Sequence, residues 1–410
     1  MRNILKQTSW LFLAQSLTRV VSFFYVIFLA GSLGVENFGQ FSVALAYFSI
    51  ISSIADLGFN RFLIREVAKD KSKVPHLLWN ILMLRLTLTS VLFAIFAMIL
   101  YSVDPDKMRI SLTLLATLSI LPQAVALTFD AVFVGMQKLQ FSAIALFILS
   151  LSTAVAGLIL VRMGFGPIGA VNALIFGQLV YAISLFLFLT RNQISILSET
   201  KLSTLKKAVV GSLPYGLLGI LGLFYFRIDT VLLSYLRGNF ETGIYSAGYK
   251  FLEAIIFIPG AFSAALFPTL AKLHDENIGE MKKIYFKSIK LMVVAGIILL
   301  IAYFFILPEV IKFFLPQFLP AIEAVRILAL SIPFIFAATP GVAVLLSSDK
   351  YLKTVILLSI FTVAFNIIFN LIFIPKFGFI AAAWITVASD IMSFLLFYLL
   401  INRKIFGIKK

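Results

Sequence analysis

Several ionisable residues lie inside long apolar runs of this sequence, where a charge needs a specific reason to be present. Among them are Arg19, Arg85, Arg227 and Lys250. A charged side chain near the centre of a bilayer costs roughly 3 kcal/mol or more, so it normally faces a partner or a water-filled cavity. Arginine suits a phosphate because its planar fork donates paired hydrogen bonds and stays charged at every relevant pH. These four residues therefore indicate a cavity that favours a phosphate-bearing ligand.

The same residues could instead form ion pairs that hold helices in register. Lys250 and Glu253 are three residues apart, which places them on one helix face, where their charges can neutralise each other. Arg19 and Arg85 have no acidic neighbour at helical spacing, so each needs a carboxylate from another helix, a cavity or an anionic ligand. The candidate carboxylate partners are Asp56, Asp130, Asp229 and Glu253. Both interpretations stay open at this point.

Other kinds of chemistry find no support in the sequence. It has no Cys, and His76 and His274 have no further ligands at metal spacing, so we expect no metal site. It also lacks the G-x-x-x-x-G-K-[ST] phosphate loop, the H-E-x-x-H zinc pair and the G-x-S-x-G nucleophile elbow. We therefore expect no enzyme activity and no cofactor. A buried carboxylate could bind H⁺ or Na⁺ as a coupling ion, and the sequence does not choose between them.

The elements that carry these residues are predicted to be membrane-spanning helices. Of the 410 residues, 61% are hydrophobic and only 13% are charged, and the mean hydropathy is +1.06. A water-soluble domain of this composition would expose large apolar patches. The apolar runs are continuous and do not alternate, so they favour helices over a β-barrel. The predicted fold class is an all-α integral membrane protein.

About twelve spans fit the chain, since each needs roughly 20 apolar residues. We place them near residues 9–32, 39–60, 77–101, 109–134, 141–161, 168–190, 208–234, 243–270, 288–307, 321–346, 354–374 and 379–401. The breaks between them, such as Gly34-Val35-Glu36-Asn37 and Pro375-Lys376-Phe377-Gly378, carry residues that end helices.

Lys and Arg residues gather in alternate loops, and this asymmetry predicts the topology. The loops on the side away from the termini hold only Lys107, Arg109, Arg162, Arg237, Lys312 and Lys376. By the positive-inside rule both termini are cytoplasmic in a multi-pass protein of the cell (inner) membrane. This placement also accounts for the formal net charge of +16, so we expect no nucleic-acid partner.

Arg61 and Arg65 follow the second predicted helix at its cytoplasmic end. They could be a solvated helix end, or they could form a cytoplasmic gate or contact lipid phosphate.

The two halves of the sequence are related by an internal repeat. At an offset of 204 Gly34 aligns with Gly238 and Gly39 with Gly243, and at an offset of 212 Phe165 and Gly166 fall on Phe377 and Gly378. Each half holds six predicted helices, so the copies are parallel repeats. We expect two six-helix lobes, residues 1–200 and 201–410, around a central cavity. The alternative is a duplication that serves stability alone.

Several segments resemble the polysaccharide-biosynthesis flippases of the O-antigen transporter type. These flippases belong to the multidrug, oligosaccharidyl-lipid and polysaccharide exporter superfamily. The segments are Leu33-Gly34-Val35-Glu36-Asn37-Phe38-Gly39-Gln40-Phe41, Asp56-Leu57-Gly58-Phe59, Arg65-Glu66, Arg227-Ile228-Asp229, Gly243-Ile244-Tyr245-Ser246-Ala247-Gly248-Tyr249-Lys250 and Leu266-Phe267-Pro268-Thr269-Leu270. The resemblance spans nearly the whole chain, although each motif is short.

The resemblance implies a flippase that carries a polyprenyl-pyrophosphate-linked oligosaccharide from the cytoplasmic to the outer leaflet by alternating access, for cell-surface polysaccharide synthesis. Membrane lipids and other polysaccharide assembly proteins would be further partners. In this interpretation Arg19, Arg85, Arg227 and Lys250 engage pyrophosphate. Asp56, Asp229 and Glu253 support them or couple to an ion.

Two alternatives from the same superfamily remain. Lipid II-type flippases typically carry two further helices, for which 410 residues leave no room. Ion-coupled multidrug or cation antiporters should favour an acidic site, whereas the spans here carry basic residues as well as acids.

Overall fold

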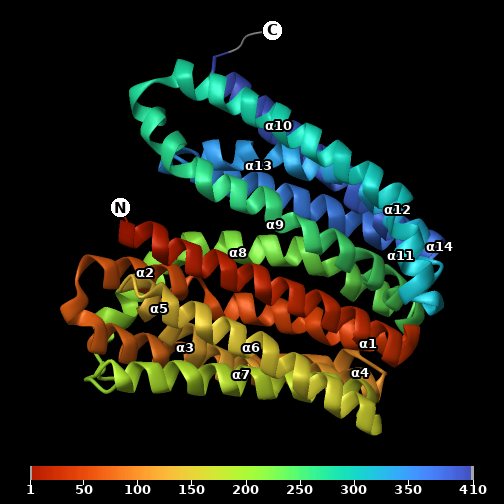
Figure 1. Cartoon of the computed structure of the whole chain (residues 1–410), viewed down its shortest axis with the longest axis horizontal. Coiled ribbons are helices and arrows are strands. Elements are labelled where there is room, and N and C mark those ends of the chain that lie inside the picture. Colours follow the sequence, from red (N-terminus) through yellow and green to blue (C-terminus); the bar gives the residue numbers. More distant parts are fainter. Residues whose placement is uncertain (1, 408–410) are drawn as a thin grey trace. The chain divides into compact units, whose positions relative to one another are not determined.

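The apolar runs fold into α-helices because hydrocarbon offers no hydrogen bonds to the backbone, so each N–H and C=O must be paired within its own segment. The computed structural model describes residues 2–407, and it describes side chains from Gln15 onward except those of Tyr215 and Asp349. The helices are α1 (Arg2–Asp56), α2 (Phe59–Lys69), α3 (Val74–Val103), α4 (Lys107–Leu118), α5 (Ile120–Gly135), α6 (Leu139–Leu160), α7 (Gly166–Arg191), α8 (Leu202–Leu236), α9 (Asn239–Glu276), α10 (Ile278–Phe305), α11 (Leu307–Phe314), α12 (Ala321–Ala329), α13 (Ile332–Leu346) and α14 (Leu352–Leu400) (Figure 1).

Left-handed glycines divide three long helical stretches into two spans each. Gly34 in α1 has φ 72°, Gly164 between α6 and α7 has φ 91°, and Gly378 in α14 has φ 59°. Eight stretches of the described chain are long and apolar enough to span a membrane, and the α12–α13 pair, bent by 44°, forms a further candidate. Three of the eight, of 42, 53 and 54 residues, contain these glycines. Splitting them and counting the bent pair once gives twelve spans within residues 2–407, which confirms the expected number.

Residue contacts divide the chain into two units. Unit 1 ends at Arg227 and unit 2 begins at Ile228. The division falls inside α8, so this helix contributes to both units. The predicted lobes, with their boundary between residues 200 and 201, stay a prediction.

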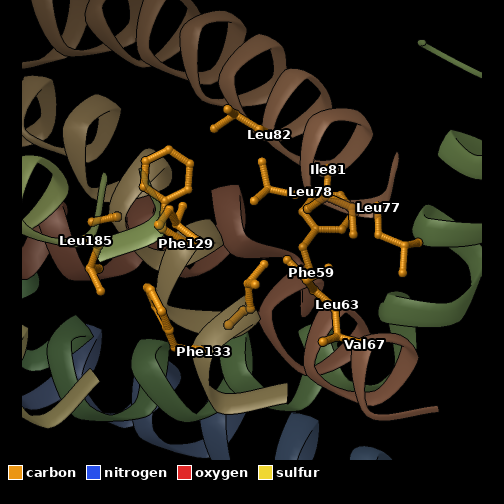
Figure 2. Packing of buried hydrophobic residues seen from close by; sticks show 14 of the residues in the cluster. Phe59, Leu63, Val67, Leu77, Leu78, Ile81, Leu82, Phe129, Phe133 and Leu185 are labelled. Carbon is orange, nitrogen blue, oxygen red and sulfur yellow. The ribbon is translucent and has the colours of Figure 1, made fainter. Parts of the chain in front are cut away.

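In unit 1 an apolar core joins α2, α3, α5 and α7. Phe59 and Leu63 of α2, Ile81 of α3, Phe133 of α5 and Leu185 of α7 are fully buried there. Figure 2 shows these side chains converging from the four helices. The core holds the short α2 against the long helices, and so fixes the turn between α1 and α2.

In unit 2 small residues let the helices approach closely. α10 packs against α13 at Gly296, where an added Cβ would lie 2.8 Å from the Cα of Pro333. α9 packs against α12 at Gly248, where a Cβ would lie 3.3 Å from a methyl group of Val325. Close backbone packing at small residues is typical of membrane helices, because no hydrophobic effect separates helix from lipid.

The turn between α1 and α2 lies directly on the backbone of α8, within unit 1. Gly58 has φ 81°, and a Cβ there would lie 2.5 Å from the carbonyl oxygen of Ser212 and 2.7 Å from the amide nitrogen of Gly216. Glycine is required here both for its conformation and for the space it leaves.

Gly58→Ala should therefore destabilise the protein by about 2 kcal/mol or more, since strain and overpacking add. Gly222→Ala is the matched control, because nothing lies within 4 Å of its Cβ position. We expect Gly222→Ala to leave the melting temperature of the detergent-purified protein unchanged or slightly raised. Equal melting temperatures for both variants would contradict the described turn.

Candidate functional site

Asp229 of α8 forms the centre of a buried polar cluster in unit 2. Its side chain is 3% exposed. Oδ2 accepts hydrogen bonds from the hydroxyls of Tyr245 (2.9 Å) and Thr386 (2.8 Å), and Oδ1 accepts one from the amide of Asn370 (2.7 Å). No Lys or Arg in the described part of the chain forms an ion pair with Asp229. Only neutral donors therefore hold the carboxylate.

Two oxygens in this cluster share one hydrogen-bond donor, and a third has no donor. The hydroxyl of Thr386 lies 2.8 Å from Asp229 and 2.9 Å from the carbonyl of Ala382, but its single proton can serve one acceptor at a time. The amide nitrogen of Asn370 bonds both Asp229 and Asn366, whereas its oxygen Oδ1 is buried without a partner among the described residues. A buried oxygen with no donor is a favourable neighbour for a cation.

The chemistry of this donor set suits a small hard cation or a proton. Carboxylate, amide and hydroxyl oxygens are preferred by hard cations, whereas transition metals prefer His and Cys. Groups of three or more His, Cys, Asp or Glu residues that could hold a metal ion are absent from the described residues. The carboxylate of Asp229 can accept H⁺, and the oxygens of Asp229, Thr386 and Asn370 are of the type that coordinates Na⁺ once the hydroxyl and amide turn toward the ion.

In unit 1 Arg85 is fully buried and its charge is matched by a carboxylate. The side chain is 1% exposed, and Nη2 donates to Oδ1 of Asp56. Nη1 donates to the hydroxyl of Thr128 (3.1 Å) and the carbonyl of Ala124 (3.5 Å), both in α5. Of the open interpretations for Arg85, the structure shows the pair with an inter-helix carboxylate.

Asp56 also stabilises the start of α2. Its carboxylate accepts hydrogen bonds from the backbone N–H groups of Gly58 (3.2 Å) and Asn60 (3.3 Å). These N–H groups would otherwise lack partners at a helix start, and a negative charge is favourable there. One carboxylate thus ties the α1–α2 turn to α3 and, through Arg85, to α5.

A second carboxylate, Asp130 of α5, is half-buried and is held by a hydroxyl. Ser142 of α6 donates to Oδ1 of Asp130. This hydrogen bond joins α5 to α6 within unit 1. From the sequence, Asp130 was predicted only as a possible ion-pair partner of an arginine. Among the described residues no arginine forms an ion pair with it.

The remaining predicted ligands are distributed over both units. Arg19 lies exposed on α1, and Arg227 is half-buried on α8, with its Nε buried. Lys250 of α9 pairs with Glu253 at 2.7 Å, which confirms the predicted local neutralisation. Their contact with a substrate stays a prediction.

Arg61 and Arg65 lie on the exposed face of α2. Arg65 is 3.4 Å from Glu66 and stacks over Phe62, with its guanidinium carbon 5.8 Å from the ring centre. Lys69 and Lys207 also contact Glu66, at 2.9 and 3.4 Å. The hydrogen bond from Lys69, together with the charge of Lys207, lowers the pKa of Glu66. Glu66 is thus surrounded by basic residues on this surface, and the role of Arg61 and Arg65 as a gate stays a prediction.

Comparison with known proteins identifies the family. Residues 4–274 match the family described as "Polysaccharide biosynthesis protein", and residues 214–372 match the MatE family. This chain belongs to the polysaccharide biosynthesis protein family. The expected resemblance is confirmed.

Two proteins similar to this chain have names that state a function. The probable flippase AglR of Haloferax volcanii is 25% identical over 261 residues, which cover 62% of this chain and 53% of AglR. The putative O-antigen transporter of Shigella flexneri is 26% identical over 306 residues, 71% of each chain. The chain therefore spans only about half the length of AglR.

The fold is similar to that of a solved membrane transporter of the MOP superfamily. A multidrug resistance MATE family transporter of this superfamily, in an inward-facing conformation, superposes with a TM-score of 0.76 at 17% identity and covers 95% of both chains. Together, the apolar spans and this similarity of fold support a multi-pass membrane protein.

Reasoning from charge found Asp229 but missed the residues around it. Tyr245, Thr386, Asn366 and Asn370 are neutral, so a search for ionisable groups passes over them. A usable signal was present, since two asparagines four residues apart in an apolar span lie on one helix face and need a polar partner.

If Arg85 is structural, removing it should destabilise the protein when no substrate is present. Arg85→Ala leaves Asp56 without its cation, and we expect a loss of about 3 kcal/mol. The double variant Arg85→Ala/Asp56→Ala should lose much less stability than the sum of the two single losses, because both substitutions remove the same ion pair. Additive shifts in melting temperature, or none for Arg85→Ala, would contradict the pair.

Proposed function

We propose that this protein is a flippase that translocates a polyprenyl-pyrophosphate-linked oligosaccharide from the cytoplasmic to the outer leaflet of the cell membrane. The observation that carries this proposal is the match to the polysaccharide biosynthesis family over residues 4–274. The names of two relatives support it in part, since one is a probable flippase and the other a putative O-antigen transporter. The MOP fold supports alternating access as the mechanism.

In this proposal the cationic residues of the spans bind the pyrophosphate or support the residues that bind it. Arg19 and Arg227 are the proposed direct ligands, because their guanidinium groups are not enclosed as that of Arg85 is. Lys250 adds a charge already paired with Glu253, so it can exchange that partner for a phosphate oxygen. Arg85 and Asp56 support this set by fixing α1, α3 and α5.

In this proposal both termini are cytoplasmic, and the basic surface of α2 with Arg61 and Arg65 lies at the cytoplasmic face. The lipid tail stays in the membrane while the sugars and pyrophosphate cross. Membrane lipids and other polysaccharide assembly proteins remain the expected further partners.

The Asp229 cluster is the proposed site of a coupling ion. A carboxylate held by neutral donors changes its charge balance when Na⁺ or H⁺ binds, whereas one held by an arginine is already neutralised. Tyr245 of α9, Asn370 and Thr386 of α14, and Asp229 of α8 come from three helices. An ion bound between them would change how these helices pack.

An ion-coupled multidrug antiporter is the second candidate function. The observation that favours it is the similarity of fold to a multidrug resistance transporter. At 17% identity this similarity concerns the fold alone.

Reconstituted protein should translocate a labelled polyprenyl-pyrophosphate oligosaccharide, and Arg19→Ala and Arg227→Ala should each slow it about ten-fold or more. A hydrogen bond to a charged group contributes roughly 1.5–3 kcal/mol, which gives this size of effect. The rate of lipid movement in proteoliposomes is the measurement, with empty vesicles as the blank.

Arg191→Gln is the matched control, since it removes an exposed charge at the end of α7. All variants must elute as folded protein. Normal lipid movement by both arginine variants would refute their role in binding. Efflux of a cationic dye without lipid movement would replace the flippase by an antiporter.

Ion binding at Asp229 should be visible without any transport. Replacing choline by Na⁺ at constant ionic strength should raise the melting temperature. Na⁺ at ten-fold above its Kd would stabilise the folded protein by about 1.4 kcal/mol. Asp229→Asn and Thr386→Val should lose this response, whereas Glu276→Gln, at the exposed end of α9, should keep it.

The same measurement across pH distinguishes the two ions. A proton site would give the native protein an additional pH dependence of stability that Asp229→Asn lacks, with no effect of Na⁺. If neither Na⁺ nor pH acts through Asp229, the cluster is not a coupling site.

A further inference from the structure

Unit 1 has an open apolar groove between α6 and α7. Its volume is about 760 Å³, and its wall includes Leu151, Val155 and Ile159 of α6 and Asn172 and Phe176 of α7. Leu151, Val155, Ile159 and Phe176 are each about half exposed. The groove takes no part in the polar clusters described above.

Small residues create this groove. α7 approaches α6 so closely at Gly177 that a Cβ there would lie 1.8 Å from the hydroxyl of Thr153. On its other side α6 meets α1 at Gly157, where a Cβ would lie 1.9 Å from the hydroxyl of Tyr25. The backbones are therefore close on the inner side, while the short side chains of Ser152 and Ala156 leave the outer side hollow.

Asn172 is the unusual member of the groove wall. It is exposed, it lies among apolar side chains, and no described residue shares a hydrogen bond with its amide. An amide that faces hydrocarbon without a partner is unfavourable by several kcal/mol. By contrast, the hydroxyl of Ser152 is satisfied by the carbonyl of Leu149 at 3.1 Å. Asn172 therefore needs a ligand with a polar group, bound to an otherwise apolar wall.

The dimensions of the groove indicate the length of this ligand. The wall residues of α6 run from Ile148 to Leu160, a rise of roughly 18 Å at 1.5 Å per residue. One leaflet contributes about 15 Å of hydrocarbon. Asn172 is six residues from the start of α7, or roughly 9 Å along the helix, which places it near the edge of the hydrocarbon. Gly169 lies against Leu160 and Gly177 against Thr153, so Asn172 is level with about Gly157. From that level the wall runs to Ile148, roughly 14 Å, which matches a chain about one leaflet long with its polar linkage at Asn172.

The second repeat uses a different residue at this place. At the offset of 212, Asn172 corresponds to Trp384, whose side chain is 50% exposed. The first half therefore keeps a small amide where the second half carries a bulky ring. Packing or stability alone does not require an asparagine at this position.

We propose that this groove binds one acyl chain of a diacyl phospholipid, whose ester region accepts a hydrogen bond from the amide of Asn172. The leaflet is the one at the Leu160–Gly166 end of the helices, which is the outer leaflet if both termini are cytoplasmic. A polyprenyl chain is the less suitable occupant, because it is longer than one leaflet. The bound lipid covers the outer side of α6, and the inner side of α6 contacts α1.

Photolabelling in vesicles tests this proposal without any transport substrate. The full chain is reconstituted in phosphatidylethanolamine and phosphatidylglycerol vesicles that contain a trace of phosphatidylethanolamine with a diazirine in one acyl chain. Mass spectrometry should find label concentrated on residues 148–160 and 172–176. Asn172→Trp, which introduces the residue of the second repeat, should reduce this label about five-fold or more.

Three further variants separate volume from hydrogen bonding. Ala156→Leu fills the groove from α6 and should also reduce the label. Asn172→Leu removes only the amide and should weaken labelling about five-fold, whereas Asn172→Gln should retain it. Ile183→Trp is the matched control, because it adds an equal ring to an exposed position of α7 outside the groove.

The result is independent of the proposed transport function, since no substrate is present. Label spread evenly over the lipid-facing helices, and unchanged in Asn172→Trp and Ala156→Leu, would show an ordinary lipid-facing surface. Stronger labelling of the same residues by a diazirine-bearing polyprenyl phosphate would overturn the choice of ligand.

Discussion

Hydrocarbon cannot hydrogen-bond, and this constraint decides where each polar group of the protein lies. The guanidinium of Arg85 is enclosed by Asp56, Thr128 and Ala124, so its charge is matched before any ligand arrives. Asp56 in turn caps the start of α2. Removing either member leaves the other charge in a medium of low dielectric constant. The position of α2, and with it the basic surface that α2 carries, therefore depends on this ion pair as well as on the apolar core beneath α2.

Unit 2 satisfies the same constraint in a different way. Asp229 has no cationic partner in the described structure, and its neighbours are hydroxyls and amides that can both donate and accept. Such neighbours can turn their oxygens toward a cation, which a guanidinium cannot do because it has no acceptor. Asp56 and Asp229 therefore differ mainly in the chemistry of their partners. Asp56 is paired with a guanidinium, whereas the partners of Asp229 could also coordinate an ion, as the proposed coupling site requires.

The sequence predicted features that depend on local spacing. The spans follow from apolar length, their breaks from turn residues such as Gly34 and Gly378, and the Lys250–Glu253 pair from helical periodicity. Contacts between distant segments could not be predicted from local spacing in the sequence. Asp56 and Arg85 are 29 residues apart, and Asp229 and Thr386 are 157 apart, so their meeting depends on helix packing that no periodicity encodes. Asp229 could be predicted as a site residue because it is charged, whereas its partners are neutral and could not be found in this way.

The two repeats share a backbone pattern and differ in the chemistry placed on it. At the offset of 204 the position of Asp229 is taken in the first half by Tyr25, whose hydroxyl lies against Gly157 and has no hydrogen-bond partner among the described residues. Asn366 and Asn370 correspond, at the offset of 212, to Ala154 and Leu158. Every polar member of this set has thus been replaced by an apolar or aromatic residue in the other half. A duplication that served stability alone would need matching packing in both halves. The divergence instead favours separate roles for the two halves, in line with the ion site proposed in unit 2 and the lipid site proposed at Asn172 in unit 1.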